Sequence, residues 1–445
     1  MLKKNDEIEV LIERLGMNGE GIATYDGVVV FVLFALPGER VIAHIIKDMK
    51  TYFIAKVVKL LNESNLRTVP PCPYFFKCGG CDTQHLCYEE ELNFKQNLVR
   101  ETIKKYAGIE TNVEKTIPSN KQFRYRNKFA LPVREIDGEI EIGLFRKNSH
   151  DIIPISDCLL QSEKIAKIIK IFKEFMRKSK VTAFNDETKC GIIKHVVGRE
   201  YGDSIILTVV VTDKKFNNFE FLISELKKEF KFFGLYKNVN TLNNNVIFGS
   251  EDEHVFGIKE LEIEEFGIRY FVNNRSFMQV NDFIKSKIYE VVLNETKNAK
   301  MVVDAYSGAG LLSSIIAKNG ATVYGVEIVK EATQNAENLK KINNLNNLNN
   351  INGDCAKIIP ELSNKFNDEF FVVVDPPRKG LDEKVVKAFI ESKPKTIIYI
   401  SCNPATLARD LKVLIEKYDV EFIKTFDMFP QTSNVETLVK LNLRK

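Results

Sequence analysis

From about residue 271 to its end, the sequence alternates short apolar runs with helical segments, and this alternation restricts the possible folds more than any other feature. Uniformly apolar strands separated by helices predict a doubly wound parallel sheet that is covered by helices on both faces. Ligands of such a sheet bind at the carboxyl ends of its strands. We expect strands at 301–304, 321–327, 371–375 and 397–401, and helices at 311–318, 330–342, 383–391 and 405–417.

The rest of the chain has a different texture. Its 445 residues are about three times the ~150 residues of a typical domain, so we expect two or three domains. Residues 1–62 alternate β-rich runs with glycine turns, which predicts a small antiparallel β-barrel. Residues 63–270 mix strand-like and helical segments and predict an α+β domain, whose helix at 88–106 we expect to pack on the third domain, 271–445. We interpret the asparagine-rich run 343–352 as a solvated connector.

Composition excludes some classes of protein and leaves others open. Hydrophobic residues make up 44% and charged residues 28%, as in ordinary globular chains. Lysine and arginine exceed aspartate and glutamate by 64 to 60, a net charge of +4 that neither demands nor excludes a nucleic-acid partner. Because no run approaches the ~20 apolar residues that span a bilayer and no signal peptide opens the sequence, we expect a cytoplasmic protein without a membrane partner.

Four elements along the C-terminal region suggest a nucleotide-like ligand. The segment 304–310, DAYSGAG, forms a glycine turn between a strand and a helix, and Glu327 ends the next strand where a carboxylate meets a ribose diol. Asp354 follows a connector, and Asp375 opens DPPRKG at the end of a buried strand. In this order the elements resemble a class I S-adenosylmethionine-dependent methyltransferase, and the missing third glycine argues against a dinucleotide.

A cysteine and a glutamate suggest covalent chemistry. Cys402 in ISCNP follows an apolar strand, so its thiolate lies at the ligand edge and could add to C6 of a pyrimidine, which activates C5 for methylation. The C5 proton must then leave, and DMFPQTSNVET supplies Glu436 as a base.

These motifs, with DPPRKGLD, closely resemble the RNA uridine-C5-methyltransferase family, and the bacterial enzymes that act on 23S ribosomal RNA in particular. The resemblance implies that Cys402 is the nucleophile and Glu436 the base. It places the methyl donor against Gln279, Tyr306, Glu327, Asp354 and Asp375, and gives Arg378 a role in holding the RNA. It also implies that residues 1–62 are an RNA-binding TRAM barrel, and we expect the enzyme to be a monomer.

Half of the eight cysteines lie close together, at positions 72, 78, 81 and 87. A disulfide is improbable in the cytosol, which leaves zinc or an iron-sulfur cluster. The spacing of Cys72, Cys78 and Cys81 resembles the [4Fe-4S] site of the same family, whose fourth ligand corresponds to Cys158. Cys87 competes with Cys158 by proximity alone.

The octet 121–128, KQFRYRNK, carries cations and aromatic rings without an acid, a combination that suits phosphates and unstacked RNA bases.

Other functions remain open. The alternatives are a transfer-RNA uridine-54 C5-methyltransferase, a cytosine-C5 methyltransferase, which the Ser-Cys-Asn-Pro context disfavours, and a non-catalytic iron-sulfur protein that binds RNA.

Overall fold

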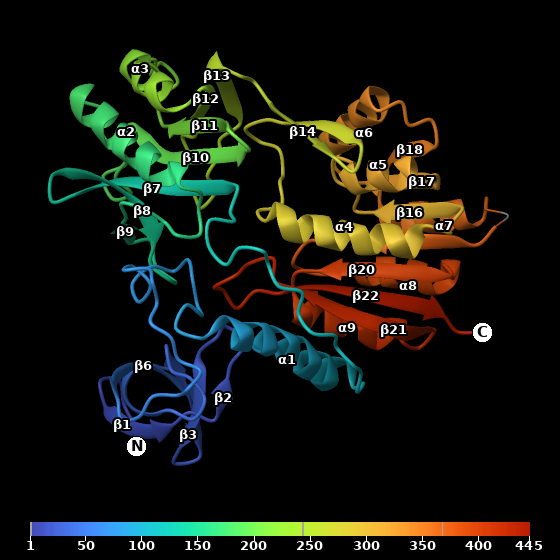
Figure 1. Ribbon diagram of the computed structural model, residues 1–445, viewed down its shortest axis with the longest axis horizontal. Helices are drawn as coiled ribbons and strands as arrows, with labels where there is room; N and C mark the ends of the chain where they lie inside the picture. The colour runs from blue at the N-terminus through green and yellow to red at the C-terminus, as the bar shows by residue number, and fades with distance from the viewer. Residues whose placement is uncertain (1, 243, 367) are drawn as a thin grey trace.

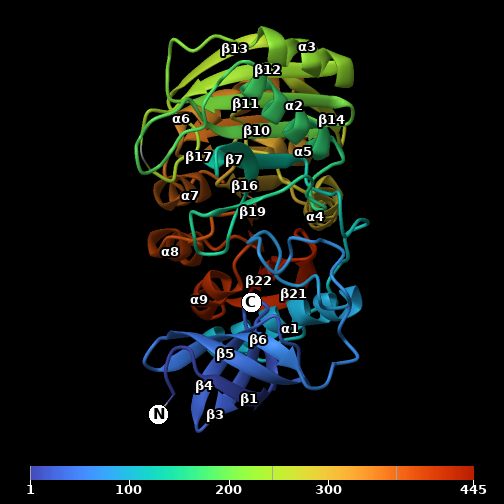
Figure 2. The same ribbon diagram turned by 90° about the vertical axis from the view of Figure 1, so that its left-hand side faces the viewer.

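The computed structural model describes residues 2–242, 244–366 and 368–445 of the chain. These residues form a small N-terminal barrel, a central mixed sheet and a larger C-terminal sheet covered by helices (Figure 1). Figure 2 shows the barrel at one end of an elongated molecule, with helix α1 above it.

The N-terminal sheet has the order β1-β5-β6-β4-β3-β2 and closes on itself, because β1 also contacts β3. Buried and exposed residues alternate along β1 and β5, so one side of each strand fills the barrel. The strands are β1 (Glu7–Leu11), β2 (Arg14–Leu15), β3 (Gly21–Tyr25), β4 (Val28–Leu33), β5 (Arg40–Asp48) and β6 (Tyr52–Leu60).

The central sheet has the order β13-β12-β11-β10-β7-β8-β9, and its two helices bury their apolar sides against it. Only β11 and β12 run parallel, and helix α3 makes the crossover between them. The elements are β7 (Lys128–Ile136), β8 (Glu139–Phe145), β9 (Ile152–Pro154), α2 (Lys164–Lys178), β10 (Ile193–Tyr201), β11 (Ser204–Val211), α3 (Glu220–Glu229), β12 (Phe232–Val239) and β13 (Glu251–Gly257).

Two elements connect these parts to the C-terminal region. Helix α1 (Tyr88–Ala107) packs against helix α9 and strand β21. The hairpin of β14 (Leu261–Glu265) and β15 (Ile268–Val272) contacts the central sheet through β14 and helices α5 and α6 through β15. The exact domain boundaries stay a prediction.

The C-terminal sheet has the order β18-β17-β16-β19-β20-β22-β21. Its first five strands are parallel, with α4, α5 and α6 on one face and α7, α8, α9 and α1 on the other, which confirms the expected doubly wound fold. The elements are α4 (Asp282–Thr296), β16 (Met301–Ala305), α5 (Leu311–Lys318), β17 (Thr322–Glu327), α6 (Lys330–Ile342), β18 (Leu348–Asn352), α7 (Cys355–Ser363), β19 (Phe370–Val374), α8 (Glu383–Ser392), β20 (Thr396–Ser401), α9 (Pro404–Leu414), β21 (Tyr418–Phe426) and β22 (Glu436–Leu443).

The asparagine-rich run is not the solvated connector that its composition predicts. Residues 348–352 form the edge strand β18, which pairs in parallel with β17, and Leu348 is fully buried. The preceding Asn347 donates from its side chain to the carbonyls of Ala317 and Ala321. These asparagines therefore satisfy backbone groups at the rim of the sheet.

Within the described residues, none of the helices combines the length and the apolar character that crossing a membrane requires.

Candidate active site

The chain reverses its direction of progress across the sheet at β16. It continues to β17 and β18 on one side and then to β19 and β20 on the other, so the carboxyl ends of β16 and β19 flank a crevice. Tyr306, Asp375 and Cys402 each follow one of the strands β16, β19 and β20 at this edge. The topology therefore brings together residues from three separate motifs.

Glu436 reaches the same edge because β22 runs antiparallel to β20. Ser401 of β20 pairs with Thr437 of β22, so the next two residues in this register are Cys402 and Glu436. Residues opposite each other in an antiparallel pair have neighbouring side chains. The sheet itself therefore places the expected nucleophile beside the expected base.

A cavity of about 570 Å³ opens at this edge. Five of the seven residues predicted as catalytic or donor-binding line it: Gln279, Tyr306, Asp375, Cys402 and Glu436. Arg378 also lines the cavity, and so does Phe277, which is 81% exposed.

Burial and charge control ionisation in the cavity. Glu436 is buried, and this burial, together with the nearby Asp375, raises the pKa of its carboxyl well above the usual value, while Arg378 opposes the shift. Asp375 is exposed at the wall of the cavity, and the protein groups that surround its carboxyl raise its pKa by desolvation. Burial and the charge of Glu436 raise the pKa of the Cys402 thiol, which Arg378 partly offsets. The resting site therefore favours protonated groups.

The nucleophile is held by a rigid turn. Asn403 caps helix α9 by accepting a hydrogen bond from the Ala405 N–H (3.0 Å), and Pro404 occupies the first turn, where no N–H is needed. The Asn403 amide also donates to the Arg378 carbonyl (3.1 Å). The Asn-Pro pair thus fixes Cys402 and ties it to the DPPRKG loop.

The glycine turn after β16 has the shape of a ligand cradle. Tyr306, Gly308 and Gly310 all have positive φ angles, and a Cβ on Gly310 would lie 2.7 Å from the Ala336 Cβ. Glu327 accepts hydrogen bonds from the N–H groups of Gly308 (3.0 Å) and Val329 (2.8 Å), which orients its carboxylate beside the turn. These residues fit a ligand with an adenosyl group and a ribose diol.

Asp354 has a structural task that its sequence context did not reveal. It caps helix α7 by accepting from the Ala356 N–H (2.9 Å) and is exposed. Neither Asp354 nor Glu327 lines the cavity beside Cys402, so the geometry separates them from the reacting groups. Their contacts with a donor stay predictions.

A second cavity is lined by the side chains of Cys72, Cys78, Cys81 and Cys158. Cys87 lies outside it, immediately before helix α1. Burial raises the pKa of the Cys78 thiol to about 11, while the nearby Arg126 lowers it. Within the residues described, no three Cys, His, Asp or Glu side chains meet closely enough to ligate one metal ion. Apolar side chains, the guanidinium of Arg126, the carboxylate of Asp157 and the amides of Gln84 and Gln161 complete the walls of this cavity.

The octet 121–128 is partly buried, and some of its side chains already have partners inside the protein. Tyr125 is 8% exposed and donates to the Pro430 carbonyl. Arg124 forms an ion pair with Asp157, and Arg126 lines the cysteine cavity. Lys121 remains exposed, and contact of this octet with RNA stays a prediction.

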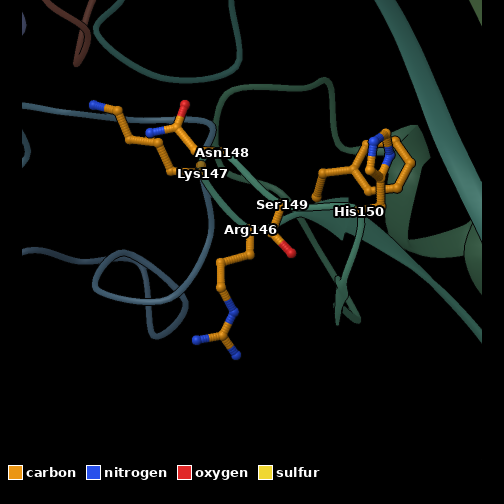
Figure 3. A pocket seen from close by; sticks show the side chains of 7 residues that line it. Arg146, Lys147, Asn148, Ser149 and His150 are labelled. Atoms are coloured by element: carbon orange, nitrogen blue, oxygen red, sulfur yellow. The ribbon is translucent and has the colours of Figure 1, made fainter. Parts of the chain in front are cut away.

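The tip of the β8–β9 hairpin borders a further cavity of about 420 Å³. Figure 3 shows that Lys147 and Asn148 point away from Arg146 and His150. His150 instead packs edge-to-face on Phe145. Because these side chains diverge, they form no convergent binding site.

Comparisons with known proteins agree with this geometry. Residues 87–444 match the family model described as tRNA (Uracil-5-)-methyltransferase, and residues 2–58 match the TRAM domain. A Listeria innocua protein named as an uncharacterized RNA methyltransferase is 36% identical over 100% of this chain and 99% of its own length. A Clostridium tetani protein with the same description is 37% identical over 98% of this chain and 96% of its own.

A solved structure is similar along almost the whole chain. It is the Pyrococcus abyssi tRNA (uracil-54, C5)-methyltransferase in complex with S-adenosyl-L-homocysteine. The two share 28% sequence identity with a TM-score of 0.79, covering 98% of this chain and 100% of the archaeal one.

Proposed function

This chain belongs to the tRNA (uracil-5-)-methyltransferase family of S-adenosylmethionine-dependent RNA methyltransferases, and we propose that it methylates C5 of one uridine in a structured RNA through a covalent adduct with Cys402. The observation that carries this proposal is the register of β20 and β22. It sets a cysteine and a buried glutamate side by side at the ligand edge of the sheet. Methylation of an amino group would need neither residue.

Cys402 starts the reaction. Its thiolate adds to C6 of the uracil, and the electron pair of the C5–C6 double bond moves toward C5 and O4. The methyl donor, when bound, supplies an electrophilic methyl group to C5. The raised pKa of the free thiol means that substrate and donor binding must favour its ionisation.

Glu436 completes the reaction. It accepts the proton from C5, the C5–C6 double bond forms again, and the thiolate of Cys402 leaves with the electrons of the C–S bond. Because burial raises the pKa of Glu436, its carboxylate is a stronger base than an exposed glutamate.

The other predicted residues bind and orient. Gln279 and Tyr306 line the cavity on the side of the donor, and Glu327 beside the glycine turn accepts hydrogen bonds from a ribose diol. Asp375 lines the cavity with both reacting residues, its charge raises the pKa of each, and it binds the uracil edge. Asp354 is the least supported of the proposed donor-binding residues, since its carboxylate already caps helix α7.

A [4Fe-4S] cluster ligated by Cys72, Cys78, Cys81 and Cys158 is part of the proposal. Its support is that these four thiols, and not Cys87, line one cavity. Arg126 in the cavity wall supplies a counter-charge for the negative cluster. The cluster holds the central region together and has no step in methyl transfer.

The RNA target is 23S ribosomal RNA in our first proposal, because the chain carries an N-terminal TRAM domain. Transfer RNA is the second candidate. The archaeal enzyme that acts on uracil-54 of tRNA matches 98% of this chain, so the barrel does not exclude tRNA. Mapping of 5-methyluridine in both RNA classes from a strain that lacks the gene identifies the target by the missing mark.

Covalent capture tests the chemistry. RNA in which the target uridine is 5-fluorouridine should form a stable adduct with the enzyme, because fluorine cannot leave C5 as a proton. Mass spectrometry should locate the adduct at Cys402. An adduct at another cysteine, or methylation by Cys402→Ala protein, would contradict the mechanism.

A further inference from the structure

The segment Asp427–Val435, here called the active-site loop, joins β21 to β22. Its Phe429 lines the catalytic cavity, and it ends directly before Glu436. The loop has no strand partner of its own, so its conformation depends on side chains and loops that pack around it. Most of those partners come from the N-terminal half of the protein, and Asn281 adds a hydrogen bond to the Met428 carbonyl.

Helix α1 holds the start of the loop. The buried Lys95 donates to the Asp427 carboxylate (2.5 Å) and to the Phe429 carbonyl (3.1 Å). Glu91, also buried, bonds Lys95 (2.7 Å) and accepts from the Gln431 N–H (2.8 Å). One helix thus fixes three successive parts of the loop.

Asp82 holds the end of the loop. It follows Cys81 directly, and its backbone N–H donates to the Gln431 carbonyl (3.0 Å). One oxygen of its carboxylate accepts from both the N–H (3.3 Å) and the hydroxyl (3.2 Å) of Ser433. The side chain of Asp82 is 14% exposed, which strengthens these bonds relative to surface contacts.

The cysteine-bearing segment 72–87 is itself fastened to the central sheet. The second oxygen of Asp82 forms an ion pair with Lys147 at the tip of the β8–β9 hairpin (2.6 Å). A Cβ on Gly79 would lie 2.7 Å from the Lys147 backbone nitrogen, so only glycine permits this close packing. The contacts therefore run from the hairpin through Asp82 to Ser433.

We propose that Asp82 is a positioning residue that fastens the active-site loop, so that the cysteine-bearing segment sets the geometry of the base step. The pairing of Glu436 with Phe426 fixes the base from its strand side, and the loop fixes it from the other. Asp82 touches neither substrate nor donor. Its effect reaches the reaction only through the Ser433 end of the loop. This inference rests on the proposed function.

The steps of the reaction should respond differently when this contact is lost. Addition of Cys402 to C6 and methyl transfer depend on β20 and the glycine turn, which Asp82 does not contact. Transfer of the C5 proton to Glu436, with reformation of the C5–C6 bond and departure of the thiolate, depends on the placement of the base. Loss of Asp82 should therefore slow only the last step, so that the methylated adduct accumulates.

The test compares Asp82→Ala, Ser433→Ala and the double variant with the unaltered full-length protein. We expect both single variants to lower kcat about tenfold and to accumulate a denaturation-resistant, methylated RNA complex, while their rate of adduct formation with 5-fluorouridine RNA stays unchanged. The double variant should be no worse than Asp82→Ala, because both act through one contact. The matched control is Asp151→Ala, which changes an exposed aspartate on the β8–β9 hairpin that carries Lys147 and should behave as the unaltered protein.

Hydrogen exchange gives a readout that does not need activity. Amides of residues 427–435 should exchange faster in Asp82→Ala and Ser433→Ala than in the control. Ser433→Ala leaves the neighbourhood of Cys81 intact, so it separates loop placement from any loss of iron. Unchanged exchange and turnover in both variants, additive effects in the double variant, or an equal loss of adduct formation would overturn the inference. If the unaltered protein forms no adduct, the proposed function itself fails.

Discussion

Cys402 shares its cavity with Glu436, Asp375 and Arg378, and the balance of their charges sets the reactivity of its thiol. Burial and Glu436 raise the pKa of its thiol, and Arg378 lowers it. Because the thiolate is the nucleophile, alkylation of Cys402 by iodoacetamide should keep rising above pH 9. At a pH high enough to ionise Glu436, Glu436→Gln should speed alkylation and Arg378→Gln should slow it, each by up to about tenfold. Mass spectrometry of Cys402 peptides across pH measures the alkylation rate of each variant. A change in the same direction in both variants would contradict the electrostatic account.

Glu436 can be separated from a residue that only supports the fold. Glutamine keeps its shape but cannot accept the C5 proton, so Glu436→Gln should form the adduct, transfer the methyl group and then stop. We expect turnover to fall at least about a hundredfold while a methyl-labelled complex with natural RNA survives denaturation. Normal turnover would exclude the role, and a folded protein that forms no complex would assign Glu436 to substrate binding.

At the scale of elements, helix α1 supplies a buried ion-pair network rather than a catalytic group. Lys95 is fully buried between Glu91 and Asp427, and burial raises the pKa of Glu91 to about 7 despite the lysine. Lys95→Met removes the shared counter-charge and should destabilise the fold by about 3–5 kcal/mol. Scanning calorimetry should show a lower Tm, whereas Lys104→Met on the same helix, whose ion pair with Glu110 is exposed, should leave the Tm unchanged. An equal Tm for the two variants would show that the buried ion-pair network contributes nothing to the stability of the fold.

The sequence predicted those helices and strands whose positions are determined by the local pattern of apolar residues. The strands β16, β19 and β20 are apolar on both faces, so their runs identify them, and the motifs at their ends place Asp375 and Cys402 correctly. Strand β18 was missed because an edge strand needs few apolar residues. It buries Leu348 fully, while its Asn350 amide donates to Glu337.

The contacts around the active-site loop had no sequence signal. Lys95 and Asp427 are separated by 332 positions, and Asp82 and Ser433 by 351, so no local periodicity relates them. The same limit applies to residues 121–128, where the acid that pairs with Arg124 lies 33 positions later in the sequence. Residues that join distant segments can be recognised only once the fold brings those segments together.

At the scale of the whole molecule, the cysteine cavity joins segments that belong to different layers. Cys72, Cys78 and Cys81 precede helix α1, whereas Cys158 follows β9 of the central sheet. Arg124 reinforces this junction by bonding both the Asp157 carboxylate and the Cys158 carbonyl. A cluster bound by all four thiols would therefore hold the cysteine-bearing segment against the central sheet on one side and the active-site loop on the other.

This arrangement predicts opposite outcomes for two cysteine variants. Protein purified without oxygen should contain about four irons per chain and show the brown absorption of a [4Fe-4S] cluster. Cys158→Ser should lose most of this iron and lower the Tm, because a metal that binds only the folded site stabilises it. Cys87 lies outside the cavity, so Cys87→Ser should keep its iron and its Tm. Stoichiometric zinc in place of iron would contradict the assignment of the cluster. Loss of iron in Cys87→Ser but not in Cys158→Ser would show that the four cysteines lining the cavity are not the four ligands.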